Sequence, residues 1–232
     1  MRTAKTVLTV IQERGKQKKP IERVYKLLFN RELYLNAYAK LYPNNGAMTK
    51  GVTDETVDGM SIQKIDRMIE ILREEKYQWK PARREYIKKK NGKKRPLGIP
   101  VWGDKVLQEV MRQILEAYYE PQFSEHSHGF RPNRGCHTAL QEIQVWKGTR
   151  WFIEGDISQY FDTIDHKILL EILARNIHDG RFIRLVSNML EAGYLEEWKF
   201  NQTISGVPQG GVISPILANI YLNEFDNWIE EV

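Results

Sequence analysis

Residues 206–215 read GVPQGGVISP, a run with two adjacent glycines that ends in a helix start. Ser214 is a favourable N-cap and Pro215 suits the first helical position, so we expect a helix from there to the C-terminus. Gly210 and Gly211 let the backbone pass close to a ligand, and a helix N-terminus favours phosphate. The run therefore predicts either a phosphate-binding loop or a plain loop-to-helix junction.

Residues 151–162 read WFIEGDISQYFD, a short apolar stretch followed by a carboxylate and a turn. The stretch 151–153 predicts a strand, which would place Asp156 at its end and Glu154 on the same face. Mg²⁺ takes one or two carboxylates together with substrate phosphates, so Asp156 is a candidate metal ligand. Helix capping is the competing interpretation, and we prefer it for Asp165.

Residues 84–90 and 93–99 predict the two strands of a β-hairpin, joined by an Asn-Gly turn signal at 91–92. Nine basic residues and one acidic residue lie within 80–95. Pro96 restricts the second strand to a sheet edge or to its own end. This charge indicates contact with phosphates, and a solvated, charge-protected edge is the competing interpretation.

The charge of the chain is divided unevenly along its length. The 232 residues carry 35 Lys and Arg against 30 Asp and Glu, a net charge of +5. Residues 1–100 hold 24 basic and 11 acidic residues, a net of +13, whereas residues 101–232 hold 11 and 19, a net of −8. A basic half beside an acidic half favours a part that binds nucleic acid joined to a part that holds carboxylates, such as a metal site.

Composition also excludes several classes of protein. Hydrophobic residues make up 41% of the chain, which is enough for a core and argues against disorder. No run of 18 apolar residues and no secretory signal is present, so we expect no membrane partner. A single cysteine, Cys136, cannot form an internal disulfide. A reducing compartment is expected, either the bacterial cytoplasm or the interior of an organelle.

The rest of the chain predicts mainly helices, and the fold class is α+β with helices in excess. Residues 1–20 are polar and basic and predict a mobile or RNA-ordered arm. Helices are expected over 21–42, 61–72, 104–120, 136–147, 165–175 and 180–192, and a strand or hairpin is expected over 198–205. Ser61 and Asp104 are the expected N-caps of the second and third helices, and Gly193 is the expected stop of the last one.

Other sites are disfavoured. His126 and His128 lie beside Glu125, but the spacing of a zinc site is absent and no cysteine pair accompanies them. Cys136 and His137 are adjacent in sequence, which is poor geometry for a nucleophile and its base, so a packed thiol is expected. No glycine-rich loop with Lys-Ser or Lys-Thr occurs, which disfavours a P-loop ATPase.

Four motifs follow one another along the chain: KKNGKKRPLGIP at 89–100, SHGFRP at 127–132, GDISQYFD at 155–162 and PQGGVISP at 208–215. Together they resemble the reverse transcriptase domain of group II intron-encoded proteins, the reverse transcriptase/maturases, over roughly residues 45–232. The last motif, which continues through LANIYL at 217–222, is the most specific. The resemblance implies a right-hand polymerase, with basic fingers followed by a palm.

The resemblance also implies the chemistry and its residues. Asp156 would be the first catalytic carboxylate and would bind Mg²⁺ together with the backbone carbonyl of Ile157. Phe161 would pack against the sugar and exclude a 2′-hydroxyl. The reaction implied is attack of a primer 3′-hydroxyl on the α-phosphate of a nucleotide, with paired metal ions stabilising the attacking and leaving oxygens.

Nucleotide and RNA contacts are implied for basic and loop residues. Lys89 and Arg95 would hold the incoming triphosphate, and Gln209 and Gly210 would line the nucleotide and template site. The partners implied are group II intron RNA and, for the full-length protein, an RNA template, a DNA primer and dNTPs; whether the chain forms a homodimer is left open. RNA contacts are expected at Lys16, Lys18, Lys19, Lys88, Lys90, Lys93, Lys94, Arg131 and Arg134.

One motif of the family is missing. A Tyr-Ala-Asp-Asp strand supplies the other catalytic aspartates of the family, and nothing like it occurs in this sequence. The expected division is a basic arm over 1–20, an N-terminal extension and fingers over 21–150, and an incomplete palm over 151–232. Asp156 alone cannot hold two metal ions, so we expect this chain to bind RNA without acting as a polymerase.

Two alternatives remain open at this stage. The chain could be a non-catalytic splicing cofactor, a maturase module that binds structured RNA through the basic residues ahead of the polymerase motifs. It could also belong to a CRISPR-associated or retron-type reverse transcriptase, which shares the core motifs.

Overall fold

A computed structural model describes residues 2–88, 92, 94–197, 199–207 and 210–231. Its helices are α1 Ala4–Lys16, α2 Arg31–Leu41, α3 Ile62–Arg73, α4 Trp102–Tyr119, α5 Cys136–Gln144, α6 Tyr160–Thr163, α7 His166–Asn176, α8 Gly180–Leu190 and α9 Ser214–Glu231. Its strands are β1 Ile21–Glu22, β2 Ala82–Lys88, β3 Lys94–Ile99, β4 Ile177–His178, β5 Tyr194–Glu196 and β6 Lys199–Asn201. Helices exceed strands, as the sequence predicts.

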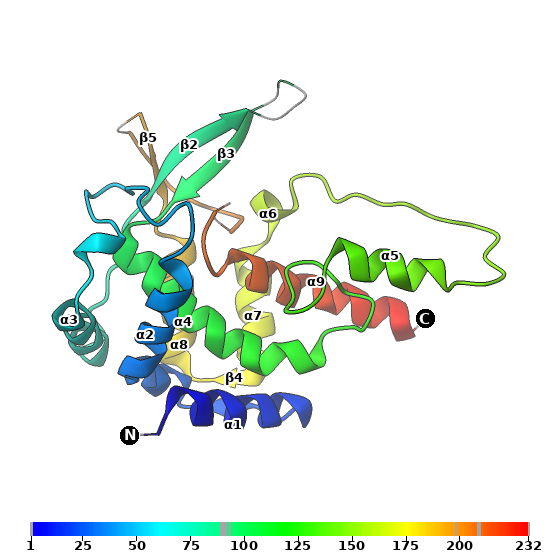
Figure 1. The fold of residues 1–232 in the computed structure, drawn as a ribbon, viewed down its shortest axis with the longest axis horizontal. Helices are drawn as coiled ribbons and strands as arrows, with labels where there is room; N and C mark the ends of the chain where they lie inside the picture. The colour runs from blue at the N-terminus through cyan, green and yellow to red at the C-terminus, as the bar shows by residue number, and fades with distance from the viewer. Residues whose placement is uncertain (1, 89–91, 93, 198, 208–209, 232) are drawn as a thin grey trace.

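Helix α4 forms the centre of the core, and α1, α2 and α9 pack against it (Figure 1). Its apolar residues are buried, including Val106, Leu107, Val110 and Met111. The helix begins at Trp102, and its N-cap is Val101. The prediction of Asp104 as N-cap is therefore wrong, because two further residues fit the helix ahead of it and the Asp104 carboxylate turns to other partners.

The first residues of the chain fold into α1, in contrast to the mobile arm expected from their charge. Thr3 caps this helix by accepting a hydrogen bond from the backbone N–H of Thr6. Ala4, Ile11 and Gly15 are buried against α4. Two of these three residues are small, which is why the apolar pattern of α1 is weak beside its lysines and arginines.

Two short sheets accompany the helices. The larger one has the strand order β3-β2-β5-β6, in which β2 pairs antiparallel with β3 and parallel with β5. The predicted hairpin is confirmed as β2 and β3, and Pro96 lies on the edge strand β3, as proline in a sheet requires. The hairpin projects from the helical body in Figure 1. The smaller sheet joins β1 to β4 in parallel.

Local signals at helix ends are mostly confirmed. Ser61 accepts from the backbone N–H of Lys64 and starts α3, and Asp165 starts α7 in the same way. Gly193 has the left-handed φ of +73, but α8 ends at Leu190 with Glu191 as its C-cap, so Gly193 forms the turn into β5 and is not the helix stop that was predicted. The single helix expected over 21–42 is instead divided into β1, a 3₁₀ segment at Val24–Phe29 and α2.

The strand expected at 151–153 is absent from the described structure. This stretch is extended without pairing, and Trp151, Phe152 and Ile153 are exposed. A strand is stabilised by hydrogen bonds to a neighbouring strand, and no described strand pairs with residues 151–153. No described helix combines the length and apolar character needed to span a bilayer.

Candidate nucleotide and nucleic-acid site

The Phe161 turn and the glycine-containing loop are joined by backbone hydrogen bonds. The N–H of Gly206 donates to the carbonyl of Ile164 at 2.8 Å, and the N–H of Val207 donates to the carbonyl of Phe161 at 2.7 Å. A Cβ on Gly206 would lie 2.8 Å from backbone atoms of Asp162, so only glycine fits. Two motifs that lie about 45 residues apart in sequence therefore meet at one place.

The same loop also meets the basic hairpin. Gly210 has φ +101, and a Cβ there would lie 2.6 Å from Leu97 Cδ1 and 2.8 Å from the carbonyl oxygen of Gly98. The close approach that the paired glycines predict is thus made to strand β3. A pocket of about 240 Å³ lies beside this contact, and Lys105 contributes to its lining.

Phe161 is held by aromatic neighbours. Its ring packs edge-to-face against Phe130 at 6.2 Å and Tyr160 at 5.8 Å between ring centroids. The hydroxyl of Tyr160 donates to the carbonyl of Ala218 in α9 at 2.7 Å. The Phe130–Phe161 contact places the loop of the SHGFRP motif beside α6. The motifs at 127–132, 155–162 and 208–215 therefore lie around the Phe161 ring and the loop that contains Gly206.

Asp156 and Ile157 lie in the unpaired stretch that precedes α6, and both are exposed. Asp156 makes no hydrogen bond or ion pair within the described residues, so its carboxylate is free to bind a cation. One free carboxylate beside a substrate phosphate fits the usual coordination of Mg²⁺. Among the described residues no group of three His, Cys, Asp or Glu side chains gathers as a ready metal cage.

The basic residues of the hairpin are only partly described. Lys89, Lys90, Lys93 and Gln209 lie outside the described residues. Lys88, Lys94 and Arg95 are exposed on β2 and β3, and the Lys94 ammonium lies 6.0 Å from the centre of the Tyr86 ring. In α1 and the turn after it, Lys16, Lys18 and Lys19 are exposed, and Lys16 is paired with Glu13 at 2.7 Å.

A cavity of about 340 Å³ lies between the hairpin, strand β5 and the segment 202–207. Arg84 and Asp162 both line it. The Arg84 guanidinium lies 3.4 Å from the centre of the Tyr194 ring, and its buried Nε has no hydrogen-bond partner. The sequence gives no signal for this pair beyond the general basic character of the hairpin, because Tyr194 lies far along the chain.

Arg131 is buried, which contradicts its expected contact with RNA. Its side chain is 4% exposed and forms an ion pair with Glu120 at 3.0 Å. It also donates to the carbonyls of Ser124 at 2.6 Å and Ser127 at 2.7 Å. The guanidinium thus closes the 120–131 turn from inside. Arg134 donates to the carbonyl of Glu125 and remains partly exposed.

We expect Arg131→Met to lower the free energy of unfolding by about 2–4 kcal/mol, because the half-buried carboxylate of Glu120 and two carbonyls lose their donor. Arg134→Met removes one hydrogen bond at a partly exposed site, and its cost should stay below about 1 kcal/mol. Urea unfolding of both variants measures the difference. Equal, small losses would show that Arg131 has no structural role and would restore it as a candidate RNA contact.

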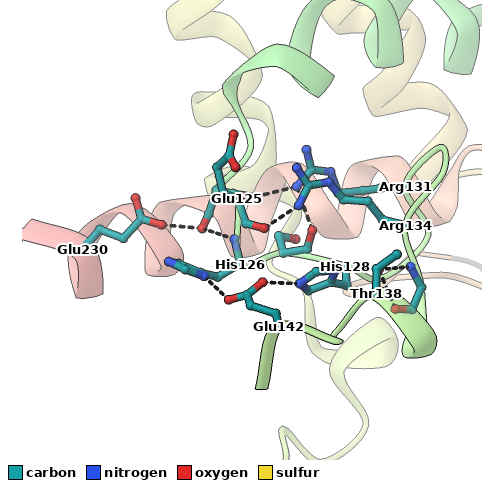
Figure 2. Close-up of polar contacts among 11 residues, drawn as sticks. Glu125, His126, His128, Arg131, Arg134, Thr138, Glu142 and Glu230 are labelled. Atoms are coloured by element: carbon teal, nitrogen blue, oxygen red, sulfur yellow. Dashed lines mark hydrogen bonds and ion pairs between the residues drawn. The ribbon is translucent and has the colours of Figure 1, made fainter. Parts of the chain in front are cut away.

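His126 and His128 both bind Glu142 of α5 (Figure 2). His128 Nε2 lies 2.8 Å from Glu142 Oε2, and its Nδ1 lies 2.8 Å from the hydroxyl of Thr138. The hydrogen bond to Glu142 raises the pKa of His126, and the hydrogen bonds from His126 and then His128 lower the pKa of Glu142. None of the α5 side chains is buried, so these contacts attach α5 to the preceding loop. The sequence shows the two histidines but not their partner 14–16 residues away.

Comparisons with known proteins place these motifs in context. Residues 87–232 match the sequence model of the reverse transcriptase (RNA-dependent DNA polymerase) family. The chain is 51% identical over 209 residues to the group II intron-encoded protein LtrA of Lactococcus lactis subsp. cremoris, covering 89% of this chain and 35% of LtrA. It is 47% identical over 237 residues to an uncharacterized 91 kDa protein in the cob intron of Schizosaccharomyces pombe, covering 99% and 29%.

A more distant relative is nuclear intron maturase 1, mitochondrial, of Arabidopsis thaliana, at 28% identity over 184 residues, covering 56% of this chain and 26% of that protein. The chain spans about a third of the length of the first two relatives. Among solved structures, a chain of a partial Cas6-RT-Cas1–Cas2 complex superposes with a TM-score of 0.58 at 20% identity, covering 90% of this chain and 35% of that chain. At this identity the likeness concerns the fold alone.

Proposed function

The chain belongs to the reverse transcriptase (RNA-dependent DNA polymerase) family, and we propose that it is the fingers and part of the palm of a group II intron reverse transcriptase/maturase. In this proposal the longer protein copies RNA into DNA and assists the splicing and mobility of its intron. The observation that carries the proposal is the meeting of three segments, in which Gly206 packs on the Phe161 turn and Gly210 packs on β3.

Different residues of the chain would have different roles at this site. Asp156 and the carbonyl of Ile157 would hold Mg²⁺, which, when bound, neutralises charge that develops on the phosphates. Phe161 would exclude a 2′-hydroxyl, and its contacts with Phe130 and Tyr160 support a fixed position of the ring. Gly210, whose backbone packs against Leu97 and Gly98 of β3, would line the nucleotide and template site.

Basic residues of the fingers would bind the nucleic acid and the triphosphate. Lys89 and Arg95 would contact the incoming dNTP, and the remaining lysines of the hairpin would contact phosphates of the template and primer. Support comes from the net charge of +13 over residues 1–100 and from the exposed cations Lys88 and Lys94. We propose intron RNA as a further partner, contacted by Lys16, Lys18 and Lys19, in the bacterial cytoplasm or an organelle interior.

Primer extension on poly(rA)/oligo(dT) with Mg²⁺ tests the proposed function. The longer protein that contains this chain should extend the primer. The 232-residue chain alone should bind the template without extension, because its sequence contains no Tyr-x-Asp-Asp and therefore one catalytic carboxylate of the expected set. Failure of the longer protein to extend any RNA-templated primer would refute the polymerase assignment, and extension by the chain alone would refute the need for further aspartates.

A further inference from the structure

A second pocket of the chain lies apart from the residues assigned to DNA synthesis. Its volume is about 550 Å³, within the range of roughly 300–1,000 Å³ of small-molecule sites. Its walls are α3, the loop 53–60, the connection 76–80 and the start of α4. Figure 1 shows α3 at the left edge of the molecule and α6, which carries Phe161, near the middle of the view. None of the residues assigned to the polymerase reaction lines this pocket.

Cations outnumber anions at the rim of the pocket, where Glu55 is the exposed acidic residue. Lys64, Arg67 and Lys76 line it and are exposed. Lys64 is paired with Glu55 at 3.2 Å and Lys76 with Glu74 at 3.0 Å. Arg67 has no hydrogen-bond or ion-pair partner in the described part of the chain. A guanidinium without a partner at the mouth of a pocket is well suited to a phosphate group.

The interior is apolar and aromatic, in contrast to the rim. Met60 and Met68 line it together with Tyr77 and Trp102. Trp102 is 3% exposed, and its indole N–H is buried without a hydrogen-bond partner. A buried donor without a partner is unfavourable, so an acceptor that reaches the indole N–H is favoured.

A buried carboxylate fixes the walls of the pocket. Asp104 is 3% exposed and accepts from the hydroxyl of Tyr77 at 2.6 Å and from the backbone N–H of Lys80 at 3.0 Å. Burial raises the pKa of Asp104 to about 6. These two bonds use about half of the acceptor positions of a carboxylate, so Asp104 can also accept a hydrogen bond from a ligand.

We propose that this pocket binds one nucleotide of single-stranded RNA, with its base inserted among the methionines and aromatic rings and its phosphate at Arg67. A nucleotide combines an anionic phosphate with a flat ring whose edge carries donors and acceptors, which matches a cationic rim around an aromatic interior. Proteins that recognise single-stranded RNA commonly stack splayed-out bases on aromatic side chains. The inference rests on the proposed function, because it assumes that this chain meets RNA.

Methionine methyl NMR of the 232-residue chain reads out this pocket directly. Met60 and Met68 lie in its lining, whereas Met48 is exposed elsewhere and Met111 is buried in α4. We expect 5′-CMP to shift the methyl signals of Met60 and Met68 in a saturable manner and to leave Met48 and Met111 unchanged. Cytosine is chosen because its amino group can donate to a carboxylate such as Asp104.

Two controls separate a nucleotide site from a general anion site. Ribose 5-phosphate carries the phosphate and the sugar without the base, and it should bind at least tenfold more weakly than 5′-CMP. Arg67→Glu should weaken 5′-CMP about fivefold or more, because it replaces an attraction by a repulsion at one exposed charge. Lys5→Glu makes the same change in net charge on α1, far from the pocket, and should alter the affinity less than about twofold.

The outcomes distinguish this proposal from the proposed function. If fluorescent oligo(rC) binds the chain while the Met60 and Met68 signals stay unchanged, the pocket assignment is wrong and RNA binding stands. Equal affinity for ribose 5-phosphate and 5′-CMP would reduce the site to an anion site and overturn the proposal. Shifts with 5′-CMP but none with oligo(rC) would also overturn it, since the site would then take free nucleotides only.

Discussion

Asp156→Asn should lower RNA-templated DNA synthesis by the longer protein about 1,000-fold or more, roughly 4 kcal/mol of transition-state stabilisation. Asparagine keeps the size of the side chain and removes the charge that a divalent cation requires. Asp156 is exposed and makes no hydrogen bond or ion pair within the described residues, so the substitution should leave folding unchanged. Primer extension under single-turnover conditions, with template affinity measured separately, isolates the chemical step.

Glu154→Gln is the matched control for this substitution. Glu154 lies two residues away in the same unpaired stretch and is also exposed. The same loss of one carboxylate charge should change the rate less than about threefold, because we assign Glu154 no ligand role. A large loss in Glu154→Gln with little loss in Asp156→Asn would reverse the assignment and make Glu154 the candidate metal ligand.

Local structure was predictable where the deciding interactions lie within a few residues. The hairpin of β2 and β3 follows from its turn signal and alternating pattern, and the caps at Ser61 and Asp165 each need only a side-chain oxygen and an N–H three residues on. The same reasoning predicted a strand at 151–153, and that prediction was wrong. The apolar residues of this stretch favour a strand, but a strand also needs a neighbour that local sequence does not specify.

The prediction of an RNA contact at Arg131 was wrong, because its side chain is buried and paired with Glu120. The polar and basic character of residues 1–20 likewise predicted an arm where the structure has α1 packed on α4, although Lys16, Lys18 and Lys19 remain exposed. A basic residue on an exposed loop and one that closes a turn from inside look the same in sequence. The difference lies in Glu120, a partner 11 residues earlier.

The candidate site was predictable as a set of motifs but not as an arrangement. Resemblance to a family selected Asp156, Phe161 and Gly210 without saying which of them touch. The contacts of Gly206 with the Phe161 turn and of Gly210 with β3 depend on packing between distant segments. Glycine was expected there for access to a ligand, and the structure shows that backbone and side-chain atoms of this chain already occupy the space beside both residues.

Gly206→Ala should be strongly destabilising for that reason. Gly206 has φ +87, and a Cβ would lie 2.8 Å from the Cα and carbonyl oxygen of Asp162 and from the carbonyl oxygen of Phe161. These are backbone atoms that cannot rotate away. The left-handed conformation costs an alanine about 1 kcal/mol and the overlap a further 1–3 kcal/mol. Thermal unfolding should show a fall in Tm of about 6–12 °C for a loss near 3 kcal/mol.

Gly180→Ala is the matched control, because it makes the same substitution with the opposite expectation. Gly180 is the exposed first residue of α8, and a Cβ there meets nothing within 4 Å. Alanine at that position should be neutral or should stabilise the chain by up to about 1 kcal/mol. A Gly206→Ala variant as stable as the parent would mean that the 203–207 segment does not rest on the Phe161 turn. The contact between motifs on which the proposed function depends would then be wrong. A loss of stability in Gly206→Ala, with Gly180→Ala unaffected, would show that this contact requires the absence of a side chain at residue 206.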